Sequence, residues 1–230
     1  MNDVMGRNSV LDMASLSLRE VNHLLKAQNA GDFEILNSNG AHALACGLEK
    51  PVHVSIKGHV GYYCAGMNQA ADIVVEGNAG TGVAENMMSG TVRVKGDASQ
   101  SAGATAHGGL LVVEGDASAR CGISLKGADI VVGGSVGHMS AFMAQAGRLV
   151  VVGDAGEALG DSIYEARLYV RGKVASLGAD CIEKDMRDEH KEELAGLLEC
   201  AGFDLQTDEF RRYGSARQLY NFKIDNIDAY

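Results

Sequence analysis

Residues 92–99 read VRVKGDAS, and the pattern returns as LVVEGDAS at 111–118 and as LVVVGDAG at 149–156. Its glycine recurs every nineteen residues without a miss, at Gly58, Gly77, Gly96, Gly115, Gly134, Gly153 and Gly172. The positions two and four before each glycine hold Val, Ile or Leu in every repeat, and those three and seven after it hold only Gly, Ala or Ser. A fixed period must be interpreted before any local motif, because it decides the architecture.

Within each repeat the aliphatic residues alternate at a spacing of two and stop at the glycine, which is typical of a short strand ended by a turn. A helical-hairpin repeat needs roughly 33 residues, and a leucine-rich repeat brings an Asn or Cys ladder that is missing here. We therefore predict an all-β fold, a right-handed parallel β-helix of about seven 19-residue coils. With strands about 4.8 Å apart, the array is roughly 30–35 Å long. The seven glycines are predicted to be structural turn residues.

The composition agrees with this fold. The chain of 230 residues has 30 glycines and one proline, Pro51, which stands just before the first regular strand. Many glycines provide turns, and the near absence of proline leaves the hydrogen bonds between strands uninterrupted.

The sequence divides into three parts. Residues 1–31 are an N-terminal segment with a helix over 18–29, because Ser17 and Glu20 form a capping box and Gly31 is a suitable stop; we expect this helix to cover the open first coil. Residues 32–182 are the β-helix. Residues 183–230 hold a C-terminal helix and a tail. The helix ends at Gly202, and it either caps the last coil or lies along the side of the rod. Its apolar face consists of Met186, His190, Leu194, Leu197 and Leu198.

Charge and cysteine content exclude several classes of function. The net charge of −10 argues against nucleic acid as a partner. No apolar run approaches the ~20 residues that span a bilayer, and no signal pattern opens the chain, so we expect no membrane association and a cytoplasmic location. Five cysteines without close pairs fit a reducing compartment better than a disulfide scaffold.

No repeat position collects the residue types of a catalytic or metal site. The recurring Gly-Asp-Ala at 96–98, 115–117 and 153–155 raises the alternative of stacked calcium ligands, but calcium-binding solenoids have a denser, nine-residue pattern. The aspartates are better interpreted as turn residues in solvent. The run from Gly77 to Gly82 lacks the spacing and the following helix of a dinucleotide site. We therefore expect no catalytic, cofactor-binding or metal-binding residue in this chain.

The tail differs from the acidic segment before it, since residues 210–223 carry four basic residues and no acid. Arginine and aromatic residues are enriched at interface hot spots, so the tail is a candidate arm for another chain. The alternative is that it folds back on the acidic helix of its own chain. The candidate interface residues are Phe210, Arg211, Arg212, Tyr213, Arg217, Tyr220 and Phe222.

The nineteen-residue array, with runs such as Val75-Glu76-Gly77-Asn78-Ala79-Gly80, resembles the GXGXG domain, the C-terminal β-helix of the glutamate synthase large subunit. The resemblance covers roughly residues 15–200. The tail, from Phe210-Arg211-Arg212-Tyr213 to Asp225-Asn226, is similar to the end of the stand-alone small subunit of N-methylglutamate synthase (methylamine–glutamate N-methyltransferase).

The resemblance implies a scaffold subunit in a hetero-oligomer. It implies a glutaminase-like partner of the N-terminal nucleophile amidotransferase type and a glutamate synthase-like partner that carries flavin mononucleotide (FMN) and an iron–sulfur cluster. The chain itself has no cysteine before Cys46 to serve as an amidotransferase nucleophile and no clustered cysteines for a cluster. Two alternatives stay open: a scaffold subunit of a formylmethanofuran dehydrogenase or formyltransferase assembly, and a stand-alone solenoid enzyme.

Overall fold

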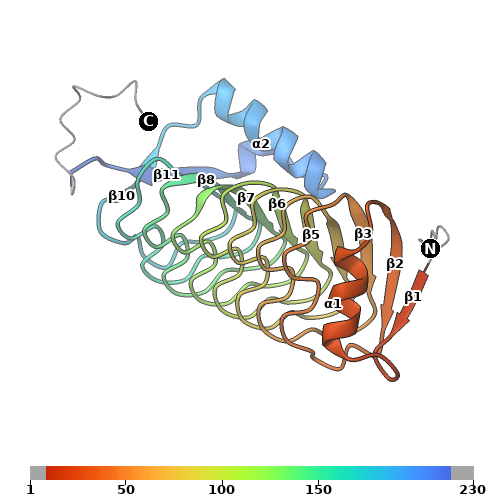
Figure 1. Cartoon of the computed structure of the whole chain (residues 1–230). Coiled ribbons are helices and arrows are strands. Elements are labelled where there is room, and N and C mark those ends of the chain that lie inside the picture. Colours follow the sequence, from red (N-terminus) through yellow and green to blue (C-terminus); the bar gives the residue numbers. More distant parts are fainter. Residues whose placement is uncertain (1–8, 219–230) are drawn as a thin grey trace, which may run out of the picture.

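The chain forms a rod built around one sheet of eleven strands, in a computed structural model that describes residues 9–218 (Figure 1). From β1 to β9 the strands follow one another in chain order, all parallel, and each step along the rod is one coil. The predicted parallel β-helix is confirmed. These nine strands are β1 (Ser9–Asp12), β2 (Gly31–Leu36), β3 (Val52–Ile56), β4 (Asp72–Val75), β5 (Thr91–Val94), β6 (Leu110–Val113), β7 (Lys126–Val132), β8 (Ala146–Val151) and β9 (Arg167–Val170).

The register of the strands produces the predicted apolar columns. Ile73 pairs with Val92 and Val75 with Val94, nineteen residues apart. All four side chains are at most 1% exposed. A second ladder of single bridges connects Val60 to Ala79 and continues through the same position of each coil to Val174. The interior is therefore filled by residues of the same repeat position stacked on one another.

Each coil has three walls: the strand of the main sheet, the segment with the single bridges, and a third segment that leads to the next strand. The backbone of this third wall has a conformation that the aliphatic pattern does not predict. Tyr63, Ala65 and Met67 have φ values of 63°, 56° and 55°, and residues at the same positions of later coils repeat this left-handed conformation. The wall still bonds from coil to coil: the Tyr63 N–H donates to the Thr81 carbonyl, and the Ala65 N–H donates back to the Leu44 carbonyl. Because these bonds link every coil to both neighbours, they hold a conformation that is uncommon outside glycine.

The glycines of the nineteen-residue period are needed for close approach rather than for a positive φ. Among the seven, only Gly58 has a positive φ, of 104°. A Cβ on Gly77 would lie 2.8 Å from the backbone of Gly58, and a Cβ on Gly153 would lie 2.6 Å from that of Gly134. Successive coils therefore touch backbone to backbone at this turn.

The N-terminal segment contributes both a helix and a strand. Helix α1 (Leu18–Lys26) starts at the predicted Ser17–Glu20 capping box, but it ends at Ala27, and Gly31 already opens β2. It buries Val21 and Leu25 against the first coils. The expected cover of the first coil is thus shared, because α1 lies against the third wall while β1, from the same 1–31 segment, pairs with β2.

The C-terminal part completes the sheet and covers its outer side. Helix α2 (Asp188–Ala201) ends at the predicted Gly202, which has a φ of 79°, and lies along the side of the rod rather than over its end (Figure 1). It packs on the outward-facing valines of β6, β7 and β8. After a 3-10 turn, η1 (Thr207–Glu209), strand β11 (Arg211–Ser215) inserts between β9 and β10 (Cys181–Lys184), antiparallel to both.

Candidate functional site

The structure places the start of the predicted interaction tail inside the chain's own fold. Phe210 and Tyr213 are each 4% exposed. The Phe210 ring packs in the cluster between α2 and the outer side of the sheet, whereas Tyr213 closes the end of the β-helix core and pairs with Leu168. These two rings are therefore not part of an exposed surface. For them, the alternative in which the tail folds back on its own chain applies.

Two basic residues of the tail, Arg212 and Arg217, also have partners in this chain. The Arg212 Nε donates to the Asp185 carbonyl at 2.9 Å. The Arg217 guanidinium pairs with Glu165 at 2.9 Å, and Arg211 is exposed at the start of β11. Tyr220 and Phe222 lie outside the described residues. The partner interface itself stays a prediction, and it would have to use the exposed residues of this segment.

A polar cluster that the sequence pattern did not reveal fastens α2 to the sheet. One carboxylate oxygen of Glu193 accepts a hydrogen bond of 2.5 Å from the Tyr169 hydroxyl. The other pairs with Arg167 at 2.5 Å and with Arg148 at 3.2 Å, and Arg148 in turn pairs with Asp129. Burial by itself raises the pKa of Glu193, but the Tyr169 hydroxyl and the two arginines outweigh it and hold that pKa below its usual value. Glu193 is therefore a charged anchor at neutral pH.

A signal for this arrangement was present in the sequence. The middle strand position points outward, yet it is apolar in four consecutive coils, at Val112, Val131, Val150 and Tyr169. An outward strand position that stays apolar indicates a covered sheet. The residues that bind Glu193 lie in β8 and β9, far from α2 in the sequence. No local spacing in the sequence therefore connects them to the helix.

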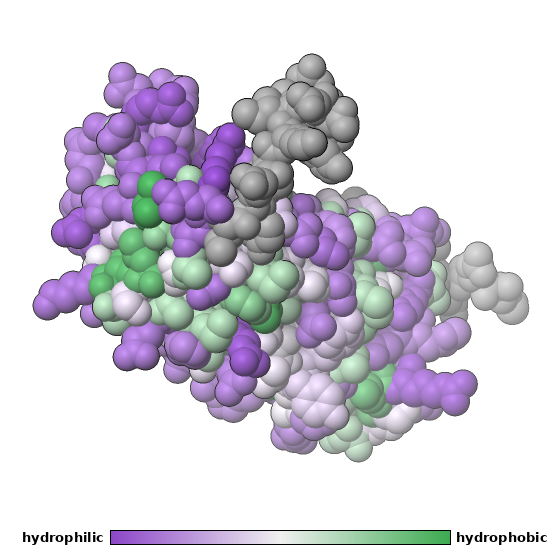
Figure 2. Space-filling model, turned by 90° about the vertical axis from the view of Figure 1, so that its left-hand side faces the viewer, coloured by the Kyte–Doolittle hydropathy of each residue, from purple (hydrophilic) through white to green (hydrophobic). Residues whose placement is uncertain are grey.

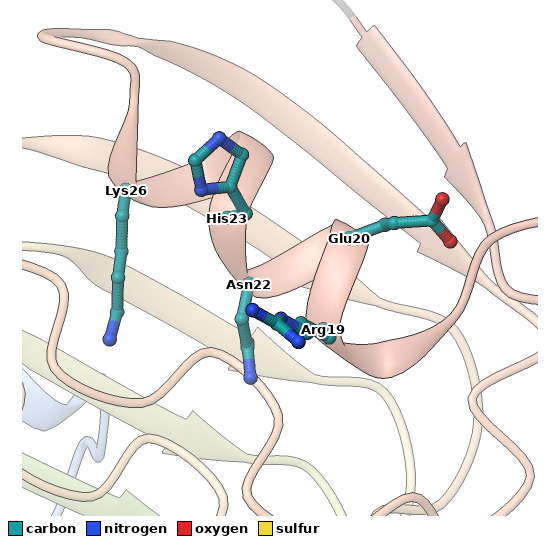
Figure 3. Close-up of a pocket in the computed structure, with 5 residues that line it drawn as sticks. All are labelled: Arg19, Glu20, Asn22, His23 and Lys26. Carbon is teal, nitrogen blue, oxygen red and sulfur yellow. The ribbon is translucent and has the colours of Figure 1, made fainter.

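A groove of about 570 Å³ lies beside α1 (Figure 3). It is lined by Arg19, Glu20, Asn22, His23 and Lys26, of which the side chains of Asn22 and Lys26 point the same way across the neighbouring coil. Asn22 is a structural residue, because its amide bonds the Ala43 carbonyl and the Ala45 N–H of the third wall. Glu20 is held by the capping box. The side chains of the groove without such a structural bond are those of Arg19, His23 and Lys26.

The chain is similar over nearly its whole length to a bacterial protein. Protein GlxC of Rhizobium meliloti (strain 1021) is 61% identical over 226 residues, which cover 96% of this chain and 99% of that protein. The chain belongs to the GlxC family. No protein-family profile matches it.

The cysteines of this GlxC-family chain are unsuited to nucleophilic chemistry where they are buried. Burial raises the pKa of Cys121 and of Cys181 to about 12 each, so both are neutral thiols at pH 7. Burial also raises the pKa of Cys46, whose Sγ donates to the Tyr63 carbonyl, and that of Cys64. A reactive cysteine requires a lowered pKa and access to solvent. These four cysteines are better explained as core residues.

The recurring aspartates accept hydrogen bonds from the backbone of the next coil. Asp97 Oδ1 accepts the Asp116 N–H, Asp116 Oδ1 accepts the Ser135 N–H, and Asp154 Oδ1 accepts the Lys173 N–H. Across residues 9–218, no three His, Cys, Asp or Glu side chains converge closely enough to hold a metal ion. The aspartates of the GlxC-family chain link one coil to the next.

Two further properties bear on the kind of partner that the chain could have. Within the described part of the chain, neither helix has the length and apolar character needed to cross a bilayer. Apolar side chains gather on part of the end at which β10 lies (Figure 2). Leu177 in the last coil and Ile182 in β10 are 37% and 42% exposed.

Proposed function

We propose that this chain is a non-catalytic scaffold subunit of a glutamate synthase-like complex. The observation that carries the proposal is the uninterrupted parallel β-helix of nineteen-residue coils, which is the architecture that the resemblance to the GXGXG domain implies. A rod whose coils bond along all three walls is stiff, and a stiff rod can fix the distance between two partner chains. Membership of the GlxC family is compatible with this role.

The complex that the resemblance favours is N-methylglutamate synthase. It converts methylamine and glutamate to N-methylglutamate and ammonia, so the amino group of glutamate is exchanged for methylamine. In this proposal a glutaminase-like chain and a chain with FMN and an iron–sulfur cluster carry the chemistry. The neutral, buried thiols of Cys64 and Cys121 are consistent with placing the cluster and the nucleophile on those partners rather than on this chain.

The experiment is to purify the tagged chain from its native host and to identify the chains that stay with it. We expect one glutaminase-like and one flavin-bearing partner, methylamine-dependent formation of N-methylglutamate by the assembly, and no turnover by the isolated chain. Molybdopterin-containing or formyl-transferring partners would instead support the formylmethanofuran dehydrogenase alternative. Turnover by the isolated chain would overturn the scaffold role.

A further inference from the structure

One long side of the β-helix carries very few charges. It is made of the third-wall segments of five consecutive coils, and we call it the loop face: residues 62–70, 81–89, 100–108, 119–127 and 138–146. Among the acidic residues, lysines and arginines of the chain, only Glu85, Arg120 and Lys126 fall in these segments. The outer side of the sheet differs, because ion pairs such as Lys57–Glu34 and Lys95–Glu76 cross from strand to strand there.

The loop face also exposes large apolar side chains. Tyr62 is 55% exposed, Met67 45%, Met88 49% and Met143 41%. Depletion of charge together with exposed tyrosine and methionine is the composition that distinguishes the core of protein interfaces from the remaining surface. Methionine in particular adapts its shape to a partner surface. The composition of the loop face therefore fits contact with another protein.

The backbone under these side chains is held rigidly in place. The Met67 N–H donates to the Glu85 carbonyl at 2.8 Å, the Met88 N–H to the Asn68 carbonyl at 2.7 Å, and the Met143 N–H to the Asp161 carbonyl at 2.8 Å. Each of these bonds joins two coils. A preformed surface loses little conformational entropy when it binds, which favours affinity.

The loop face itself carries two cations and one carboxylate, and the next coil adds acidic residues beside it at positions 157, 161 and 165. Arg120 and Lys126 are exposed and form no ion pair with any residue of 9–218. At the end of the face near α1, the Lys26 Nζ lies 3.4 Å from the Cβ position of Gly47, whose N–H donates to the Gly66 carbonyl of the loop face. The α1 groove thus continues this surface, and the loops of the successive coils follow α1 along the rod (Figure 1).

We infer that the loop face is the docking surface for a different protein chain, one that presents neutral apolar side chains around a cluster of carboxylates. Unpaired cations on a chain of net charge −10 are complementary to an acidic partner. A second copy would add another −10 to the assembly, which opposes self-association. This inference rests on the proposed scaffold function, and it assigns the face that meets a partner.

The test uses the full chain expressed together with the glutaminase-like and flavin-bearing chains. One double variant, Met67→Glu with Met143→Glu, places carboxylates in the proposed apolar contacts. A second, Arg120→Glu with Lys126→Glu, reverses the unpaired charges. Lys173→Glu is the control on an exposed lysine outside the loop face, and it changes the net charge by as much as the two methionine substitutions together. All four side chains of the double variants are exposed, so we expect unchanged circular dichroism and thermal unfolding for the chain alone.

We expect each double variant to bind one of the two partners about tenfold or more weakly, since a charge buried without a partner is costly. Lys173→Glu should bind as the unaltered chain does, and the arginine–lysine variant should lose part of the salt dependence of binding. If the unaltered chain assembles and both double variants assemble equally well, the loop face is not the docking surface, while the scaffold proposal survives. If the unaltered chain binds neither partner, both proposals fail. If the variants change only self-association, a second copy occupies the face and the inference is wrong.

Discussion

Asp97 Oδ1 accepts a hydrogen bond of 2.9 Å from the backbone N–H of Asp116, the residue nineteen positions later. The bond depends on the glycine that precedes Asp116, because a Cβ on Gly115 would lie 2.2 Å from the same oxygen. The glycine column and the aspartate column of the sequence are therefore one structural device. His59, Asn78 and Ser135 serve at the same position as the aspartates, which shows that a hydrogen-bond acceptor, rather than a negative charge, is the common requirement.

This relationship predicts how substitutions of Asp116 behave. Asp116→Ala removes the acceptor of the Ser135 N–H, and we expect the free energy of unfolding to fall by about 1 kcal/mol. Asp116→Asn keeps an oxygen at that place and should remain within about 0.5 kcal/mol of the unaltered chain. Urea unfolding followed by circular dichroism measures both. Equal losses in the two variants would mean that the charge matters, and a further rise in stability with added calcium would revive the calcium-site alternative.

A pair of glycine substitutions separates close approach from backbone flexibility. A Cβ on Gly134 would lie 2.1 Å from Asp116 Oδ1 and 2.7 Å from the Gly115 carbonyl, so Gly134→Ala should destabilise the fold by about 1–3 kcal/mol. Gly196, in α2, has nothing within 4 Å of its Cβ position. Gly196→Ala should therefore stabilise the chain by up to about 1 kcal/mol. Thermal unfolding midpoints should move in opposite directions, and a shared direction would contradict the packing explanation.

The repeat made much of this fold accessible from sequence, because a nineteen-residue period fixes which residues stack. Val54, Ile73 and Val92 can be assigned to one column without coordinates, and the same period predicts the glycine turns. The left-handed backbone of the third wall was harder to predict from the sequence. Tyr63 and Thr105 adopt a positive φ while their N–H groups bond to the Thr81 and Ile123 carbonyls of the next coil, and single-residue preferences argue against that conformation.

The ends of the rod were the least predictable part. Composition identified α2 and its stop at Gly202, but the insertion of β11 between β9 and β10 joins residues far apart in the chain. Phe210 and Tyr213 looked like interface residues because aromatic residues beside arginines are typical both of interfaces and of strands that close a sheet. The deciding fact is the antiparallel register of Tyr213 with Leu168, which no local pattern contains.

The anchor of α2 predicts a dependence on pH. Since the pKa of Glu193 is held below its usual value of about 4.3, its contribution to stability is complete above that pH and is lost as pH falls through the lowered pKa. Glu193→Gln should lower the free energy of unfolding by about 1.5–3 kcal/mol at pH 7, the usual range for a hydrogen bond to a charged group. The difference from the unaltered chain should shrink below about pH 4.

The matched control for this prediction is Glu192→Gln, which neutralises an exposed neighbour on the same helix that forms no ion pair within residues 9–218. We expect its stability to follow that of the unaltered chain at every pH. Far-ultraviolet circular dichroism is the suitable signal, because the chain has no tryptophan. A constant difference between Glu193→Gln and the unaltered chain from pH 7 to pH 3 would show that the charge of Glu193 does not fasten α2.

Two truncations distinguish the packing role of the tail from a partner role. The chain that ends at Gln218 is the reference, because it keeps every contact described here for residues 9–218. Removing 210–230 deletes β11, uncovers the edge of β9, and takes away two aromatic rings that are each 4% exposed. Loss of one such ring costs about 3–5 kcal/mol, and an open strand edge promotes aggregation. We expect the shorter chain to be strongly destabilised and partly aggregated in size-exclusion chromatography. If it is instead as stable as the chain ending at Gln218, the tail does not complete the core, and its aromatic residues are again candidates for a partner interface.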